Sequence, residues 1–251
     1  MFFEHAFFAQ IMLESLPISS STHLRLLGLS APWLLDFCAH GPTALMLIGF
    51  TAPDWWYWVR TVTRTWRTSL YFIVLLALSE LLTAFLFGLK YVVFKVPDMP
   101  ATAGLALTAL LLLSLLWRPR ATRTAIGVHE AIVLGVTQGL TCFLGFSRLA
   151  STIAVGRWCG LSNRTAFLYS LALQIPLFGA GALLGCWKLW GAQQAVFSLG
   201  AGSLVLATLA CMVVAYFLLW GVQRMVESDK LWLFGVYVGT LALLLTFLPI
   251  S

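Results

Sequence analysis

The sequence contains few charged residues. Only 10% of its 251 residues are Asp, Glu, Lys or Arg, whereas 61% are hydrophobic and the mean hydropathy is +0.93. A soluble domain of this length carries roughly 25% charged residues, which cover its surface. Because this polar cover is missing, we exclude a soluble globular domain and expect lipid to be the solvent for most of the surface.

Three other patterns are absent. The five cysteines are odd in number and widely spaced, mostly inside apolar segments, so neither a disulfide framework nor a zinc site is expected. No Ser/Gly/Pro-rich linker divides the chain, and we expect one membrane domain over residues 1–251. The chain begins Met1-Phe2-Phe3-Glu4 without a basic segment, which predicts that there is no cleavable signal peptide.

The net charge of +6 comes from 15 basic and 9 acidic residues. A basic excess can indicate nucleic-acid binding, but these basic residues are spread over short loops between apolar runs. That distribution is typical of loops that face anionic lipid at the inner leaflet, so we expect a membrane and no nucleic acid as partner. The sequence leaves the oligomeric state open, with a homodimer among the alternatives.

Long apolar runs dominate the chain. A spanning helix needs about 20 mainly apolar residues, and six such runs occur, near 34–53, 69–89, 102–117, 165–186, 195–221 and 231–249. Two further apolar segments, near 5–29 and 129–160, are interrupted midway by small and polar residues. Irregular backbone survives at membrane depth only where protein or a wet cavity surrounds it. We therefore predict an all-α polytopic membrane protein with six transmembrane helices and two re-entrant helical hairpins.

The charges of the loops predict the orientation. If both hairpins return to the side they entered, eight basic residues lie on one side of the membrane and three on the other. The eight belong to the loops at 54–68, 118–128 and 222–230, and the three to the loops at 90–101 and 187–194. The positive-inside rule makes the first side cytoplasmic. Both termini then face outward, and the two hairpins enter from opposite sides.

The two interrupted segments match each other. When Gln10 is set against Gln138, 128 positions later, Ser19 falls on Ser147. Each hairpin is followed by three apolar runs, which indicates an inverted-topology repeat whose site lies where the two broken helices meet. The pseudo-repeats cover approximately 1–120 and 121–251.

The first interruption gathers reactive side chains. Gln10 and Glu14 are four residues apart and share a helical face, and an acid inside an apolar run is by default functional. Ser20 and His23 follow closely. A hydroxyl nucleophile needs a neighbouring base, which an imidazole or a carboxylate supplies, and an imidazole can itself attack phosphorus. Either Ser20 or His23 can therefore be the nucleophile.

The second interruption carries Ser147, Arg148 and Thr152. The guanidinium fork of arginine matches phosphate oxygens, and phosphoryl transfer requires mainly positioning and charge neutralisation. Structural alternatives are a resting ion pair between Glu14 and Arg148, or serines that only bond backbone at a helix break. The complementary chemistry of the two interruptions favours a phosphoryl-transfer site between them.

These segments resemble the motifs of the undecaprenyl-diphosphate phosphatase family, also called bacitracin-resistance proteins. The resemblance covers nearly the whole chain and rests on Gln10-Ile11-Met12-Leu13-Glu14, Leu16-Pro17-Ile18-Ser19-Ser20-Ser21-Thr22-His23-Leu24 and Gly145-Phe146-Ser147-Arg148-Leu149-Ala150-Ser151-Thr152. His40-Gly41 also stands where the family often has a histidine or glutamine beside a glycine. The chain departs from the family pattern at Thr22, Leu144, Leu149 and Ala150.

The resemblance implies hydrolysis of undecaprenyl diphosphate to undecaprenyl phosphate and inorganic phosphate in the bacterial plasma membrane. This reaction recycles the carrier lipid for peptidoglycan synthesis and gives bacitracin resistance. The resemblance further implies a divalent cation, Mg²⁺ or Ca²⁺, held by Glu14 and Gln10. By the same resemblance the catalytic residues are Glu14, Ser20, His23 and Arg148, and the residues that bind the substrate are Gln10, Ser147, Arg148 and Thr152.

A polyprenyl-phosphate flippase or transporter is the alternative, because inverted repeats are typical of transporters. The cluster of an acid and a candidate nucleophile at the first interruption favours the enzyme, since a carrier needs no nucleophile. A non-catalytic membrane scaffold would leave that buried polar cluster without a purpose.

Overall fold

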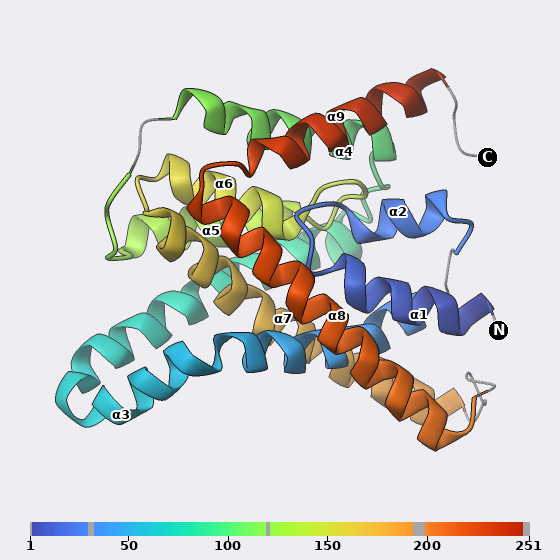
Figure 1. Ribbon diagram of the computed structural model, residues 1–251, viewed down its shortest axis with the longest axis horizontal. Helices are drawn as coiled ribbons and strands as arrows, with labels where there is room; N and C mark the ends of the chain where they lie inside the picture. The colour runs from blue at the N-terminus through green and yellow to red at the C-terminus, as the bar shows by residue number, and fades with distance from the viewer. Residues whose placement is uncertain (1, 30–32, 119–120, 193–198, 248–251) are drawn as a thin grey trace.

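The structure is a computed structural model that describes residues 2–29, 33–118, 121–192 and 199–247. In this part of the chain all regular structure is helical, apart from one isolated bridge between Arg123 and Leu161. The helices cross one another in a layered bundle, with the start of helix α1 and the end of helix α9 at one side and the bend of helix α3 at the other (Figure 1). The all-α prediction is confirmed.

Both predicted interruptions are breaks between short helices. The first separates α1 (Phe2–Leu13) from α2 (Ser20–Leu26), and the second separates α5 (Val128–Leu140) from α6 (Arg148–Trp158). Pro17 cannot continue α1 because it lacks a backbone N–H. Gly145 has a φ of +84°, a left-handed conformation that glycine adopts at little cost. Local turn chemistry therefore explains both breaks.

Helix α3 (Trp33–Gly88) contains the first two predicted apolar runs in one long element that bends at Thr65 (φ −118°, ψ 25°). The prediction of a loop at 54–68 is wrong, because the backbone is helical through most of it. Its polar and aromatic side chains bond within the helix instead. The guanidinium of Arg60 packs 4.7 Å from the ring of Trp56, one turn earlier, and the Thr61 hydroxyl donates to the carbonyl of Tyr57 at 3.0 Å.

The remaining helices overlap the predicted runs, and two of them end six residues later than predicted. They are α4 (Ala101–Ser114), α7 (Asn163–Ala192), α8 (Ala201–Glu227) and α9 (Trp232–Phe247). Short turns of other types extend two helices, a π-helical turn after α3 (Leu89–Val93) and a 3₁₀ turn after α4 (Leu115–Trp117). Because α7 continues to Ala192, most of the loop expected at 187–194 is also helical. Residues 193–198 lie outside the described residues.

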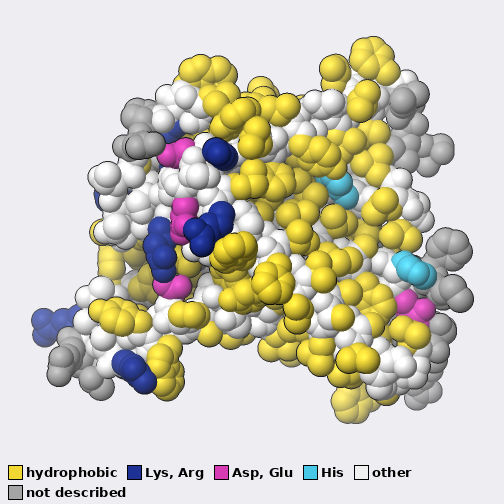
Figure 2. Space-filling view, in the orientation of Figure 1, with side chains coloured by type: hydrophobic (Ala, Val, Ile, Leu, Met, Phe, Trp, Pro, Cys, Tyr) yellow, Lys and Arg dark blue, Asp and Glu magenta, His cyan; other side chains and the backbone are white. Residues whose placement is uncertain are grey.

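Three helical stretches are long and apolar enough to cross a membrane, namely Thr65–Val93, Asn163–Trp190 and Ala201–Glu227, and α4 and α9 are shorter apolar helices. Hydrophobic side chains cover most of the face seen in Figure 2, whereas most of the charged side chains in view gather toward the end where α3 bends. Together these features describe a multi-pass membrane protein.

The two halves of the chain pack into each other. Helix α3 lies against α7, and α4 lies against α9. Helix α5 of the second half packs on α3 of the first, while α1 of the first half packs on α8 of the second. Hydroxyls bridge α3 and α5, since Ser79 donates to the carbonyl of Ala131 at 2.8 Å and Thr83 to that of Gly135 at 3.0 Å. This interlocking brings the two helix breaks to a common cavity.

Candidate active site

A cavity of about 800 Å³ lies between the two breaks. Its walls come from the first break, the second break, the end of α3 and the middle of α7. Five of the predicted site residues line it, and these are Gln10, Glu14, Ser20, Ser147 and Arg148. Residues that are far apart in the sequence therefore meet at one site.

Glu14 is the buried acid of the site, with only 3% of its side chain exposed. The Nε2 of Gln10, one turn earlier, donates to Glu14 Oε1 at 2.9 Å. The Nδ1 of His40 lies 2.8 Å from the same oxygen. The positive charge of Arg148 also acts on this carboxylate. A carboxylate inside an apolar bundle is expensive unless it is paired, and these groups supply the pairing.

The sequence analysis did not place His40 in the site. This histidine comes from α3, outside both breaks, and it lines the cavity beside Glu14. The available signal was the His40-Gly41 pair, which matches the family pattern. That signal did not reveal the contact, because the contact depends on how α3 crosses α1.

Phe178 on α7 was also missed, and it supports two of the polar groups. Its ring stacks on the imidazole of His40 with centroids 4.7 Å apart, and the guanidinium carbon of Arg148 lies 5.0 Å from its ring centroid. A cation over an aromatic face is attracted by the ring quadrupole. Phe178 therefore lies between the histidine and the arginine and helps to fix both.

The second break presents Arg148 at the first position of α6. Ser147 caps this helix, since its Oγ accepts a hydrogen bond from the Ala150 amide at 3.3 Å. The amide of Ser147 donates to the Oγ1 of Thr108 on α4 at 3.0 Å. Arginine and the free amides of a helix start both favour an anion. The turn thus forms a suitable cradle for a phosphate group.

The two predicted candidates for the nucleophile lie in different surroundings. Ser20 is half-buried and lines the cavity. His23 is not among the lining residues; its Nδ1 lies 2.7 Å from the carbonyl of Ser19 and its Nε2 lies 3.0 Å from the hydroxyl of Tyr237. A carbonyl only accepts, so Nδ1 carries a proton, and in the neutral ring Nε2 accepts from Tyr237. Both ring nitrogens of His23 are therefore engaged outside the cavity.

Thr152 is the other predicted residue that does not line the cavity. It is fully buried, and its hydroxyl donates to the carbonyl of Arg148 at 2.8 Å. This bond lies within the first turn of α6. The role of Thr152 in substrate binding stays a prediction, and in the structure its hydroxyl supports the helix that carries Arg148.

Two oxygen atoms at the site suit a metal cation. Gln10 Oε1 and Glu14 Oε2 are buried and have no hydrogen-bond partner. Oxygen donors are the ligands that Mg²⁺ and Ca²⁺ prefer, and Mg²⁺ commonly combines one or two carboxylates with phosphate oxygens of a substrate. No cluster of three or more His, Cys, Asp or Glu side chains suited to a metal occurs among the described residues. The residues present fit a cation that is shared with a phosphate ligand.

A second acid–amide contact, which is partly buried, mirrors the first. The Nε2 of Gln138, which aligns with Gln10 in the sequence, donates to Glu80 Oε1 on α3 at 3.0 Å. Gln174 on α7 lines the cavity nearby, next to the Leu173 carbonyl that lies 3.5 Å from the same amide nitrogen. Glu80 itself is not among the cavity-lining residues, so this contact supports α5 rather than the site.

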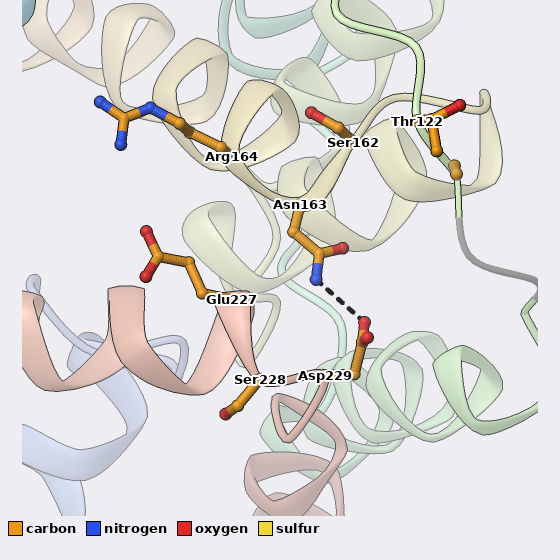
Figure 3. A pocket seen from close by; sticks show the side chains of 8 residues that line it. Thr122, Ser162, Asn163, Arg164, Glu227, Ser228 and Asp229 are labelled. Atoms are coloured by element: carbon orange, nitrogen blue, oxygen red, sulfur yellow. Dashed lines mark hydrogen bonds between the residues drawn. The ribbon is translucent and has the colours of Figure 1, made fainter.

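Another pocket, of about 560 Å³, lies at the junction between α7 and the end of α8 (Figure 3). Asp229 at this junction is engaged, because Arg157 and Asn163 each donate to its Oδ1 at 3.0 Å. Figure 3 shows Arg164 directed away from Asp229, toward the far side of the pocket. The hydrogen bonds tie the end of the second hairpin to the α8–α9 turn, which describes a structural junction rather than a reaction site.

Comparison with known proteins gives one consistent result. The undecaprenyl-diphosphatases of Thermosynechococcus vestitus and Deinococcus radiodurans are 28% and 29% identical to this chain, covering 91% and 92% of it and 88% and 90% of the relatives. That of Desulfosudis oleivorans is 30% identical over 91% of this chain and 90% of its own length. The family model described as bacitracin resistance protein BacA matches residues 9–244. The chain therefore belongs to the bacitracin resistance protein BacA family.

Proposed function

We propose that this protein is an integral membrane phosphatase that hydrolyses undecaprenyl diphosphate to undecaprenyl phosphate and inorganic phosphate. The observation that carries the proposal is the cavity that the Glu14–His40 pair, Ser20 and Arg148 line together. An acid, a hydroxyl and an arginine in one buried space are the parts that phosphoryl transfer requires. The reaction would return the carrier lipid to peptidoglycan synthesis and give resistance to bacitracin.

In the proposed mechanism Ser20 is the nucleophile, because it lines the cavity whereas His23 does not. Glu14 Oε2, which has no hydrogen-bond partner, takes the hydroxyl proton. The Ser20 oxygen bonds to the terminal phosphorus while the bond to the bridging oxygen breaks, and undecaprenyl phosphate leaves. Water then hydrolyses the phosphoserine, which releases inorganic phosphate and restores the hydroxyl.

Arg148 stabilises the charge that develops during this reaction. Its guanidinium can bond two phosphate oxygens at once, and Phe178 behind it restricts its rotamers. A divalent cation held by Gln10 Oε1 and one lone pair of Glu14 Oε2 would neutralise further charge on the phosphate oxygens, and the second lone pair of Oε2 accepts the Ser20 proton. His40 orients the carboxylate from the opposite side.

The proposed membrane arrangement has six spans and two re-entrant hairpins, with pseudo-repeats at approximately 1–120 and 121–251. The reciprocal packing of α5 on α3 and of α1 on α8 supports an inverted repeat. Both described chain ends lie on one side of the molecule, opposite the bend of α3 (Figure 1). We place the termini on the outer side of the bacterial plasma membrane and the bend in the cytoplasm.

The test is phosphate release from undecaprenyl diphosphate by the purified protein in detergent, with and without EDTA. Glu14→Gln, Ser20→Ala and Arg148→Ala should each lower kcat/KM by about 10²-fold or more. Glu227→Gln makes the same change to an exposed acid that accepts a hydrogen bond from Gln223 on the same helix, outside the cavity lining, and it should retain activity. EDTA should lower the rate, and added Mg²⁺ or Ca²⁺ should restore it.

Two results would overturn parts of this proposal. If folded wild-type protein bound the lipid but released no phosphate, the proposed phosphatase activity would be contradicted. A carrier of the same lipid would then be favoured. Full activity of Ser20→Ala together with an inactive His23→Ala would transfer the nucleophile's role to His23.

A further inference from the structure

Lys90 is a buried charge that the proposed mechanism does not use. Only 4% of its surface is exposed, and its Nζ donates to the carbonyl of Cys142 at 2.7 Å and to Asp98. The Nζ also lies 4.6 Å and 4.4 Å from the ring centroids of Tyr91 and Phe143. A buried ammonium is costly even when paired. Its position at the second break therefore calls for an explanation beyond packing.

The backbone around Lys90 is irregular in a way that places this side chain inward. Residues Leu89–Val93 form a π-helical turn, in which Phe94 N bonds Leu89 O at 2.8 Å. The next lysine, Lys95, has a φ of +47° and is exposed. Isolated π-turns often occur at functional sites, and a left-handed lysine carries a conformational cost. The backbone that follows α3 is thus locally strained near the place where the Lys90 side chain contacts the second break.

The carbonyl that Lys90 holds begins the turn at 141–147. The same turn is fixed at two further points by α4. Thr108 Oγ1 accepts from the Ser147 amide at 3.0 Å and lies 3.3 Å from the carbonyl of Gly145. Gly104 packs so closely on the turn that a Cβ there would lie 2.1 Å from the Leu144 carbonyl. Lys90 is the only charged side chain described at these three points, and it holds the start of the turn together with the hydroxyl of Tyr91, which donates to the same carbonyl at 3.1 Å.

The residue that follows this turn is Arg148. We infer that Lys90 is a positioning residue, which fixes the 141–147 turn through the Cys142 carbonyl and so sets where Arg148 meets the diphosphate. This inference rests on the proposed function for the role of Arg148. Displacement of a binding group by about 1 Å can cost 10²-fold in rate, so a side chain that never touches the substrate can control the reaction.

Direct binding of phosphate by Lys90 fits the structure less well. Tyr91, Asp98, Cys142 and Phe143 all line the cavity, whereas Lys90 is not among the lining residues. Its ammonium is directed to the carbonyl of Cys142 and the carboxylate of Asp98, which occupy its donors. Lys90 therefore acts on the substrate through the turn.

A double-mutant cycle tests this coupling. Lys90→Met and Arg148→Lys are measured alone and together by kcat/KM on undecaprenyl diphosphate, with Lys95→Met as a control that removes the same charge from an exposed site. Lys90→Met should lower kcat/KM by about 10- to 100-fold, and Lys90→Arg, which keeps a donor for the carbonyl, should recover most of it. The double variant should lose less than the product of the two single losses. A multiplicative loss, or an unchanged Lys90→Met, would overturn the inference.

A second readout does not require activity. Cys142 lines the cavity, so its thiol reports on the turn when the other four cysteines are replaced by alanine. Lys90→Met should raise the rate of maleimide labelling at Cys142 by about threefold or more, whereas Lys95→Met should leave it unchanged. Equal labelling rates would overturn the inference.

If Lys90→Met does not fold, Lys90→Gln replaces it in both experiments. Wild-type protein without phosphatase activity would refute the proposed function, and the labelling would still decide the role of Lys90.

Discussion

At the scale of single residues, the site depends on how one carboxylate is paired. Glu14 Oε1 accepts a hydrogen bond from Gln10 and lies 2.8 Å from His40 Nδ1, whereas its Oε2 has no hydrogen-bond partner. This arrangement holds the side chain in place by one oxygen and keeps the other oxygen available for a proton or a cation. His40 is the partner that comes from a different helix, and its ring is fixed in turn by Phe178.

His40→Ala should therefore lower kcat by about 10²-fold, since the carboxylate loses its orienting group. The measurement is phosphate release at saturating lipid, with the amount of folded protein checked by size-exclusion chromatography. His129→Ala is the matched control, because 74% of the His129 side chain is exposed. Wild-type kinetics in His40→Ala, together with an inactive Glu14→Gln, would show that the carboxylate works without this partner.

Tyr237→Phe distinguishes a structural from a catalytic His23. The change removes only the hydroxyl that bonds His23 Nε2 at 3.0 Å. If that bond is structural, the variant should keep kcat within about threefold and lose about 1 kcal/mol of unfolding free energy. Thermal unfolding in detergent and phosphate release on the same sample measure both quantities. A large loss of kcat without a loss of stability would instead indicate that His23 takes part in the reaction.

At the scale of elements, close packing of helices fixes the second break. Gly104 of α4 lies directly beneath the turn at 141–147, and Gly135 of α5 lies against the backbone of Ser79 on α3. Neither position has room for a side chain. These contacts let α4 and α3 approach the second hairpin closely enough for Thr108, Ser79 and Thr83 to form their hydrogen bonds.

Gly104→Ala should destabilise the protein by about 1–3 kcal/mol, because the added methyl group meets backbone that cannot move aside easily. The loss should appear as a lower unfolding temperature in detergent and a lower phosphatase rate. Gly202→Ala in α8 is the matched control, since nothing lies within 4 Å of the new methyl group. If both variants unfold at the same temperature, the turn tolerates displacement.

The start of α5 predicts a dependence of stability on pH. Burial by itself raises the pKa of Glu130, but hydrogen bonds from the Gly127 amide, Arg123 and His129 outweigh it and hold the pKa below its ordinary value. A carboxyl with a lowered folded pKa stabilises the protein fully above its unfolded pKa, and the contribution is lost as the pH falls through the folded pKa.

Glu130→Gln should therefore unfold at a lower temperature than wild type at pH 7. The difference between the two proteins should shrink as the pH is lowered below about 4.3, the ordinary pKa of glutamate. Unfolding curves recorded from pH 7 to pH 3 measure this difference in unfolding temperature. A difference that stays constant over this range would show that the hydrogen bonds of Glu130 do not depend on its charge.

At the scale of the whole molecule, two interlocked halves create a site that neither half contains alone. Glu14 and Ser20 come from the first half, whereas Arg148 and Phe178 come from the second. The reciprocal packing of α1 on α8 and of α5 on α3 holds the halves together. If the two halves were separated, the activity should therefore be lost even while each half kept its helices.

The proposed orientation predicts which lysines are reachable from outside the cell. Lys95 lies after the π-helical turn of α3 and Lys230 lies before α9, and both are exposed. In intact cells a membrane-impermeant amine reagent should label Lys95 and spare Lys230, whereas both should react in opened membranes. Mass spectrometry of the peptides measures the labelling. Labelling of Lys230 alone in intact cells would reverse the orientation.

The sequence by itself determined the class of fold and the location of the two breaks. Apolar runs long enough to span a membrane and the turn residues Pro17 and Gly145 act over a few positions, so their effects can be read locally. The same reasoning failed at 54–68, where aromatic and arginine side chains pack within the helix and a bend at Thr65 replaces the expected loop. Composition alone did not distinguish an interfacial loop from an interfacial helix.

Only the tertiary structure decided how the site is assembled. The sequence placed Glu14, Ser20 and Arg148 at the breaks, but the contacts of His40 and Phe178 with them depend on how α3 and α7 cross the hairpins. The direction of the His23 ring toward Tyr237 on α9 depends likewise on packing across 214 positions of the chain. Such contacts follow from the burial of side chains between helices that are distant in sequence, and no local pattern of residues encodes them.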